Sequence, residues 1–205
     1  MSLQTTPSIW DRPQGYGLVS RVLHWLMAAL FAVQFLSAIF HLVDRHLPLT
    51  QIIWSVHYSI GLTLFILVIV RAVWGVMNLR TRPPHGHGLL GLASMGGHLA
   101  LYALMIFVPG VALLRAYGGG RGFSAFGLQI FQPGADNEAM VAPAHLLHGP
   151  AGWALLALVA GHIVMVFVHK YLWQEDVLGR MTRGQQDDAR IGKTSVPAGR
   201  AIEQG

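Results

Sequence analysis

Four long stretches with almost no charged residues constrain what this sequence can fold into. They cover about residues 22–42, 52–76, 89–114 and 145–172. About 20 helical residues cross a hydrocarbon core of about 30 Å, so each stretch is long enough to span a bilayer. Only 11% of the 205 residues are Asp, Glu, Lys or Arg, against roughly 25% in a soluble domain. The sequence therefore predicts an all-α integral membrane four-helix bundle and argues against a soluble enzyme.

The basic residues predict how the bundle lies in the membrane. One side collects Arg12, Arg21, Arg71, Arg80, Arg82, Lys170, Arg180 and Arg183. The other side has Arg45, Arg115 and Arg121, diluted by Asp44, Asp136 and Glu138. Because loops rich in Lys and Arg stay in the cytoplasm, we expect both termini to be cytoplasmic. This topology accounts for the net charge of +5 without a nucleic-acid partner.

The chain divides into one membrane domain, residues 1–183, and a polar tail, residues 184–205, which we expect to be a disordered cytoplasmic extension. The connection between the third and fourth spans, from Arg115 to about Ala144, is long for a helix–helix loop. It contains a glycine cluster at 118–122 and three phenylalanines. We expect it to form an external cap on the bundle, with the glycines as turn residues.

Histidines are the residues that point to chemistry. Cysteine is absent, which excludes thiolate metal sites and covalent haem attachment, whereas there are 11 histidines. His148 and His162 are 14 residues apart on the fourth span. On a helix this spacing places the two side chains within about 40° of each other and about 21 Å apart along the axis. One helix face thus offers an imidazole near each membrane surface, as two stacked planar metal cofactors require.

Each such cofactor needs a second imidazole from another helix. His24 lies near the cytoplasmic start of the first span, at the expected depth of His162. His57 lies near the external start of the second span, at the expected depth of His148. We therefore predict the pairs His24 with His162 and His57 with His148. A haem iron with two imidazole ligands has no open position, so it transfers electrons rather than binding substrate.

Five segments together make the sequence resemble the bacterial cytochrome b561 family of four-span di-haem cytochromes b. The resemblance covers roughly residues 17–183. The segments are SRVLHW at 20–25, VHYSIG at 56–61, GHLALY at 97–102, FSAFGL at 123–128 and the stretch 162–173. The resemblance implies two non-covalent haem b groups on His24, His57, His148 and His162, electron exchange with membrane ubiquinone, and residence in the bacterial inner membrane. One branch of the family resembles a superoxide oxidase, which passes electrons from periplasmic superoxide to ubiquinone.

Other histidines are open to two interpretations. His145 could exchange roles with His148, although the 14-residue spacing favours His148. His98 either makes a structural hydrogen bond or ligates iron. His169 either contacts a quinone or haem propionate, or lies simply at the interface. The remaining histidines lie at span ends or in loops and are expected to be solvated: His41, His46, His85 and His87.

Three arginines are also candidates for the site. Arg71 either pairs with propionates of the inner haem or anchors the second span at the membrane surface. Arg115 and Arg121 either pair with outer propionates, steer a small anion such as superoxide, or are ordinary loop charges.

Three functions remain open. The first is a relay between an external one-electron donor and ubiquinone. The second is a cytochrome b anchor subunit that exchanges electrons with a soluble hydrogenase- or dehydrogenase-type partner. The third is a haem-free transporter or scaffold, which is disfavoured because histidine pairs at two depths exceed what a single ion site needs. The first is favoured because 205 residues leave no large docking domain.

Overall fold

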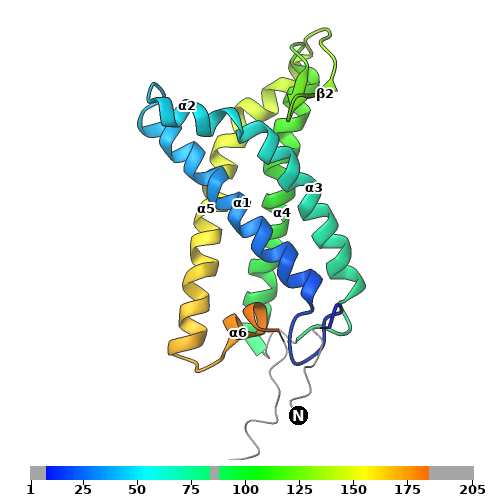
Figure 1. Ribbon diagram of the computed structural model, residues 1–205, viewed down its shortest axis with the longest axis vertical. Helices are drawn as coiled ribbons and strands as arrows, with labels where there is room; N and C mark the ends of the chain where they lie inside the picture. Colours follow the sequence, from blue (N-terminus) through cyan, green and yellow to red (C-terminus); the bar gives the residue numbers. More distant parts are fainter. Residues whose placement is uncertain (1–7, 84–87, 185–205) are drawn as a thin grey trace, which may run out of the picture.

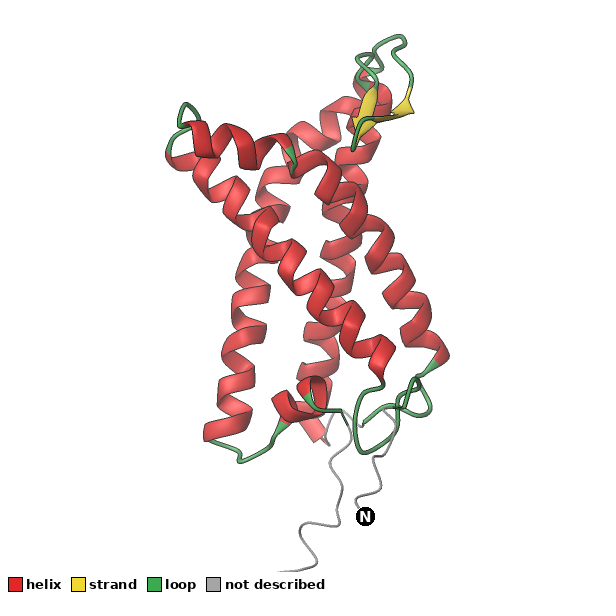
Figure 2. Ribbon diagram, viewed as in Figure 1, coloured by secondary structure: helices red, strands yellow, loops and turns green. Residues whose placement is uncertain are grey.

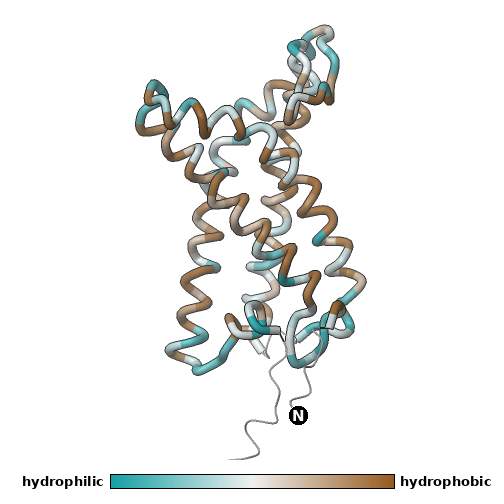
Figure 3. The backbone as a smooth tube through the Cα atoms, viewed as in Figure 1, coloured by the Kyte–Doolittle hydropathy of each residue, from teal (hydrophilic) through white to brown (hydrophobic). Residues whose placement is uncertain are grey.

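The structure is a computed structural model that describes residues 8–83 and 88–184. Its four long helical segments are α1 (Leu18–Val43), α2 with α3 (Pro48–Ser55 and His57–Met77), α4 (Gly88–Gly118) and α5 (Glu138–Tyr171), followed by the short α6 (Val177–Thr182) (Figures 1 and 2). All four are long and apolar enough to cross a membrane, and apolar residues run along their lengths (Figure 3). The predicted all-α, four-span fold is confirmed. The cytoplasmic placement of the termini stays a prediction. Outside the described residues lie the tail from residue 185 onward and two of the histidines, His85 and His87.

The bundle has two ends, which we name by what lies there (Figure 1). The tail end holds the start of α1, the last residues of α3 and α5, and α6. The hairpin end holds α2, the end of α4, the start of α5 and a two-stranded hairpin. The larger basic group of the sequence falls at the tail end, as the predicted topology requires.

The second span is two helices rather than one continuous helix. Pro48 occupies the first turn of α2, where its missing N–H leaves no partner unsatisfied. At Val56 the backbone N–H bonds back to the carbonyl of Trp54, two residues earlier, and the α-helical pattern is interrupted. The chain then turns into the bundle as α3, whose first residue is His57. The break therefore places this histidine at the hairpin end of its helix.

The helix that contains the fourth predicted span begins before that span. We expected it to start near residue 145, but α5 begins at Glu138 and continues to Tyr171, with Pro143 and Pro150 inside it. Asn137 precedes the helix with extended backbone angles, and Glu138 places a negative charge at the positive end of the helix dipole. These polar residues and Pro143 lower the local hydropathy, so a search for an apolar span starts too late.

The connection between α4 and α5 contains an antiparallel hairpin, β1 (Phe123–Ala125) with β2 (Leu128–Phe131). Phe126 and Gly127 form its turn with φ of 51° and 80°. The backbone N–H of Phe126 donates to Ser59 Oγ of α3 (3.2 Å), which docks the hairpin on the bundle. Gly120 and Gly122 are turn residues with positive φ, as expected, whereas Gly118 is the last residue of α4.

An apolar core fills the middle of the bundle. Its buried members come from all four spans: Met27, Phe31, Leu64, Val68, Val108 and Leu155. Over their whole lengths α5 packs mainly on α4, α1 packs mainly on α3, and α3 also packs on α4. The seams between α5 and the α1–α3 pair are less closely packed.

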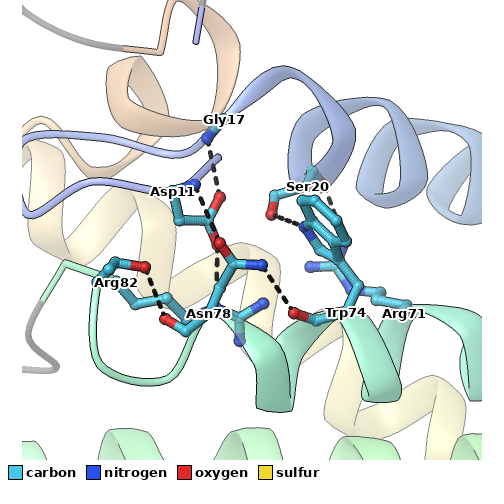
Figure 4. A network of polar contacts seen from close by, with 8 residues as sticks. Asp11, Gly17, Ser20, Arg71, Trp74, Asn78 and Arg82 are labelled. Carbon is cyan, nitrogen blue, oxygen red and sulfur yellow. Dashed lines mark hydrogen bonds and ion pairs between the residues drawn. The ribbon is translucent and has the colours of Figure 1, made fainter. Parts of the chain in front are cut away.

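Polar contacts close the tail end around Asp11, which is 1% exposed (Figure 4). Its carboxylate accepts from Arg82 Nε (3.1 Å) and from the backbone N–H of Gly17 (2.8 Å). Its own N–H donates to Asn78 Oδ1 (3.2 Å). Beside this cluster Trp74 Nε1 donates to Ser20 Oγ (2.8 Å). The segment before α1 is thereby tied to the end of α3.

The same end of α1 also holds α6. Three donors from this region reach the last carbonyls of α6: the backbone N–H of Tyr16 to Arg180, Arg21 Nη1 to Thr182 and Trp25 Nε1 to Met181. Burial raises the pKa of the Tyr16 phenol above its usual value of 10.0, although Arg82 opposes the rise. Because α6 follows α5 directly, these contacts link α5 to α1 where the two long helices themselves pack loosely.

Candidate functional site

Two pairs of histidine rings face each other inside the bundle, one near each end. At the tail end the ring centroids of His24 and His162 lie 6.4 Å apart. At the hairpin end those of His57 and His148 also lie 6.4 Å apart. All four side chains are half-buried. The structure thus brings together the pairs that the sequence predicted, which we call the tail-end pair and the hairpin-end pair.

Helix α5 supplies one histidine to each pair. Leu155 lies midway between His148 and His162 and is 2% exposed in the apolar core. The 14 residues between the histidines correspond to about 21 Å of helix. The two pairs are therefore separated by the core layer, and each lies across a seam between α5 and another helix.

Hydrogen bonds orient both rings of the hairpin-end pair. His57 Nδ1 lies 2.7 Å from Ser37 Oγ of α1, and His148 Nδ1 lies 3.0 Å from the Val108 carbonyl of α4. A carbonyl oxygen only accepts, so His148 carries its proton on Nδ1 and leaves the Nε2 lone pair for another partner. Four helices cooperate in building this pair.

The donor set fits a metal held between two imidazoles. Imidazole nitrogen binds metals at about 2 Å, so two rings on opposite sides of one metal have centroids about 6 Å apart. Both pairs meet this requirement, and neutral imidazole is a ligand of haem iron. By contrast, no group of three or more His, Asp or Glu side chains in the described ranges is arranged to hold a bare metal ion. The residues present therefore fit a haem at each pair better than a simple ion.

A stack of rings covers His57 on the outer side. The Trp54 ring stacks on His57 at 4.5 Å and on His41 at 3.9 Å between centroids. We expected His41 to be solvated, but it is half-buried and lies inside α1. The interruption at Val56 allows this stack, because it turns α2 so that Trp54 faces the end of α1.

The tail-end pair has a third histidine beside it. The ring centroid of His98 lies 5.5 Å from that of His162. His98 Nδ1 lies 2.7 Å from the carbonyl of Ser94, one turn earlier in α4, and the side chain is exposed. This contact is the local hydrogen bond that we considered for His98.

The two remaining candidate histidines lie in different surroundings. His145 is exposed, whereas His148 is half-buried against His57. His169 Nδ1 lies 2.9 Å from Glu175 Oε2, and its ring contacts Trp173 edge-on. The described contacts of His169 are thus made with the segment that follows α5.

The candidate arginines are divided between the two ends. Arg71 is half-buried at the tail end, where Nη1 donates to the Ser20 carbonyl (3.1 Å). Arg115 ends α4 and Arg121 lies before the hairpin, and both are exposed. The roles that we considered for these three arginines at a haem or an anion stay predictions.

Comparison with known proteins agrees with this geometry. A family model for prokaryotic cytochrome b561 matches residues 15–184. The chain belongs to this family. Cytochrome b561 homolog 2 of Escherichia coli (strain K12) is 28% identical over 187 residues, which is 88% of this chain and 98% of the relative. The resemblance seen in the sequence is confirmed.

Membership in the cytochrome b561 family sets the general function. The chain is a multi-pass protein of the bacterial inner membrane that binds haem b and transfers electrons. The matched region contains both histidine pairs, the hairpin and α6. The chain accordingly interacts with the lipid bilayer and with redox partners.

Sequence reasoning missed the groups that orient the histidines. Ser37 had no predicted role, and a backbone carbonyl such as that of Val108 has no sequence signature. Trp54 had no predicted role either. A lone hydroxyl within an otherwise apolar stretch is the one sequence signal that could have pointed to Ser37.

Proposed function

We propose that this chain is a di-haem b electron-transfer protein that exchanges electrons between a periplasmic one-electron donor and membrane ubiquinone. The observation that carries the proposal is the pair of ring separations, 6.4 Å at both ends of the bundle. Two ligand pairs at two depths provide two redox centres in series across the membrane. A single centre near one surface would not connect the two sides.

The ring separations support the following residue roles. His24 and His162 would hold the inner haem iron, and His57 and His148 would hold the outer one. When bound, haem supplies reversible one-electron chemistry at iron. The protein fixes ring orientation through Ser37 and the Val108 carbonyl, and the apolar layer around Leu155 keeps water out of the space between the centres.

Charged and polar side chains near each end fit supporting roles. In this proposal Arg71, half-buried at the tail end, would pair with inner-haem propionates, and His169 would be a further contact for a propionate or quinone. The exposed Arg115 and Arg121 favour the approach of an anionic donor to the hairpin end, and superoxide is the small anion that fits this role. Ubiquinone is the acceptor in this scheme.

The alternative is an anchor subunit that passes electrons to or from a soluble hydrogenase- or dehydrogenase-type partner. Mixing the purified chain with superoxide or quinol separates the two. The relay function predicts haem reduction by either reagent without a partner protein. Reduction only after a partner is added would favour the anchor function.

Single histidine variants test the haem assignment. We expect two haem b per chain in the unaltered protein, measured by pyridine haemochrome after purification in detergent. His24→Ala and His162→Ala should each lose one haem. The haem lost should be the same in both variants, so that their reduced-minus-oxidised spectra agree. His57→Ala and His148→Ala should each lose the other haem.

His145→Ala is the matched control, because this exposed residue lies three positions from His148 on the same helix. It should retain both haems. Loss of haem from His145→Ala together with full retention in His148→Ala would move the ligand assignment to His145. Full haem content in His24→Ala would overturn the pairing.

A further inference from the structure

Ser37 is a polar side chain in an otherwise apolar part of the bundle. It lies on α1 and is 1% exposed. Its hydroxyl oxygen lies 2.6 Å from the Gln34 carbonyl on its own helix and 2.7 Å from His57 Nδ1 on α3. Nearby, Gln34 Nε2 donates to the His57 carbonyl (3.2 Å). Two side chains of α1 are thus directed at one histidine.

Counting protons decides the direction of these bonds. A serine hydroxyl has one proton, and a carbonyl oxygen only accepts. The contact with Gln34 therefore uses the hydroxyl proton of Ser37. The contact with His57 then requires Nδ1 to carry the ring proton and donate it to Ser37 Oγ. Nε2 of His57 is left as the nitrogen with a free lone pair.

We propose that Ser37 is a positioning residue that fixes the tautomer of His57 and strengthens it as an iron ligand. A ring that donates its second N–H to an acceptor is a more basic ligand, and such ligands favour the more positively charged, oxidised iron. Ser37 therefore lowers the reduction potential of the haem at the hairpin-end pair. This inference rests on the proposed function, because it requires a haem on His57.

The partner ring has an equivalent arrangement with one difference. His148 donates to the Val108 carbonyl, a backbone group that side-chain substitution does not remove. Of the two groups that accept from the paired histidines, only Ser37 is a side chain. A substitution at Ser37 can therefore change the reduction potential of this haem, whereas a substitution at Val108 keeps the carbonyl. The Trp54 stack restrains the face of the His57 ring but exchanges no proton with it.

The test is a potentiometric titration of Ser37→Ala, monitored by the visible spectrum of each haem. We expect the potential of one haem to move upward and that of the other to stay unchanged. Loss of an acceptor behind a ligating histidine typically weakens metal binding about 10-fold or more, so the same haem should also be lost first on dilution. Ser37→Thr keeps a hydroxyl and should restore the original potential.

Ser59→Ala is the matched control. Ser59 is also buried and lies two residues from His57, but its hydroxyl contacts the hairpin and not a histidine. It should leave both potentials unchanged. Two haems with unaltered potentials in Ser37→Ala, or an equal shift in Ser59→Ala, would overturn the role of Ser37 while leaving the proposed function intact. Full haem content in His57→Ala would instead refute the proposed function at this pair.

Discussion

Asp11 joins two segments that are distant in the sequence, the stretch before α1 and the residues at the end of α3. Its side chain is fully buried and pairs with Arg82, which is 18% exposed. From its place in the sequence, Arg82 was expected only to contribute to the membrane topology, and Asp11 had no expected role. A charge taken out of water needs both its ion partner and hydrogen-bond donors, and here Arg82 and the N–H of Gly17 provide them.

Removing this carboxylate should destabilise the protein strongly. Asp11→Ala leaves the Arg82 guanidinium without its partner, and breaking one side of a buried pair costs about 3 kcal/mol. We expect a clear fall in the thermal unfolding midpoint of the detergent-solubilised protein, followed by circular dichroism.

Glu175→Ala provides the comparison for Asp11→Ala. Glu175 also pairs with a basic residue, but its side chain is 53% exposed. Exposed pairs contribute less than about 1 kcal/mol, so its midpoint should barely move. Equal midpoints in the two variants would show that the Asp11 cluster does not hold the tail end together.

The difference between the predictable and the unpredictable parts of the site is also clear at single residues. His148 and His162 were identified because helical spacing alone puts them on one face. His24 and His57 followed from their depth in their spans. The acceptor behind His57 was not predictable, because it depends on the angle at which α1 crosses α3, and no periodicity encodes that angle.

Among the elements, α4 and α5 form the closest seam of the bundle. Gly118 ends α4 at this seam, where an added Cβ would overlap with Met140 Cβ of α5. Gly96 lies on the same helix, and an added Cβ there would meet nothing within 4 Å. A side chain is therefore excluded by a close neighbour at Gly118 but not at Gly96.

The same substitution should act in opposite directions at these two positions. Gly118→Ala forces α4 and α5 apart and should destabilise by about 1–3 kcal/mol, as overpacking does. Gly96→Ala should stabilise by up to about 1 kcal/mol, because alanine favours the helix. Thermal unfolding of both variants measures the difference, and destabilisation of similar size would mean that the seam is not the cause.

The elements themselves were predictable wherever hydropathy defines them. All four spans were found, and the first lies entirely within its helix. Two boundaries were not: the interruption at Val56 falls inside an apolar stretch, and the first turns of α5 are too polar for a span. Hydropathy reports the solvent around a helix, whereas these features are decided by backbone hydrogen bonds and capping.

At the scale of the whole molecule, α5 connects the two histidine pairs as one continuous helix. The other histidines of the two pairs come from α1 and α3, so the two pairs are aligned only if α5 keeps its helical phase. Inserting one alanine after Ala157 rotates His162 by about 100° relative to His148. We expect such a protein to hold one haem instead of two by pyridine haemochrome.

An insertion elsewhere controls for this experiment. One alanine after Gly134, in the loop between the hairpin and α5, leaves the phase between the histidines unchanged, and an added Cβ at Gly134 would meet nothing within 4 Å. This variant should keep both haems. Two haems in the Ala157 insertion would mean that the helix absorbs the extra residue locally.

The continuity of α5 has a consequence for how this sequence can change over time. Between His148 and His162 most side chains face lipid or apolar neighbours, and one apolar residue can replace another there with little effect. The number of residues between the two histidines has no such freedom, because it fixes both the distance and the direction from one centre to the other. In this stretch the identity of the residues can drift, whereas their count is held constant.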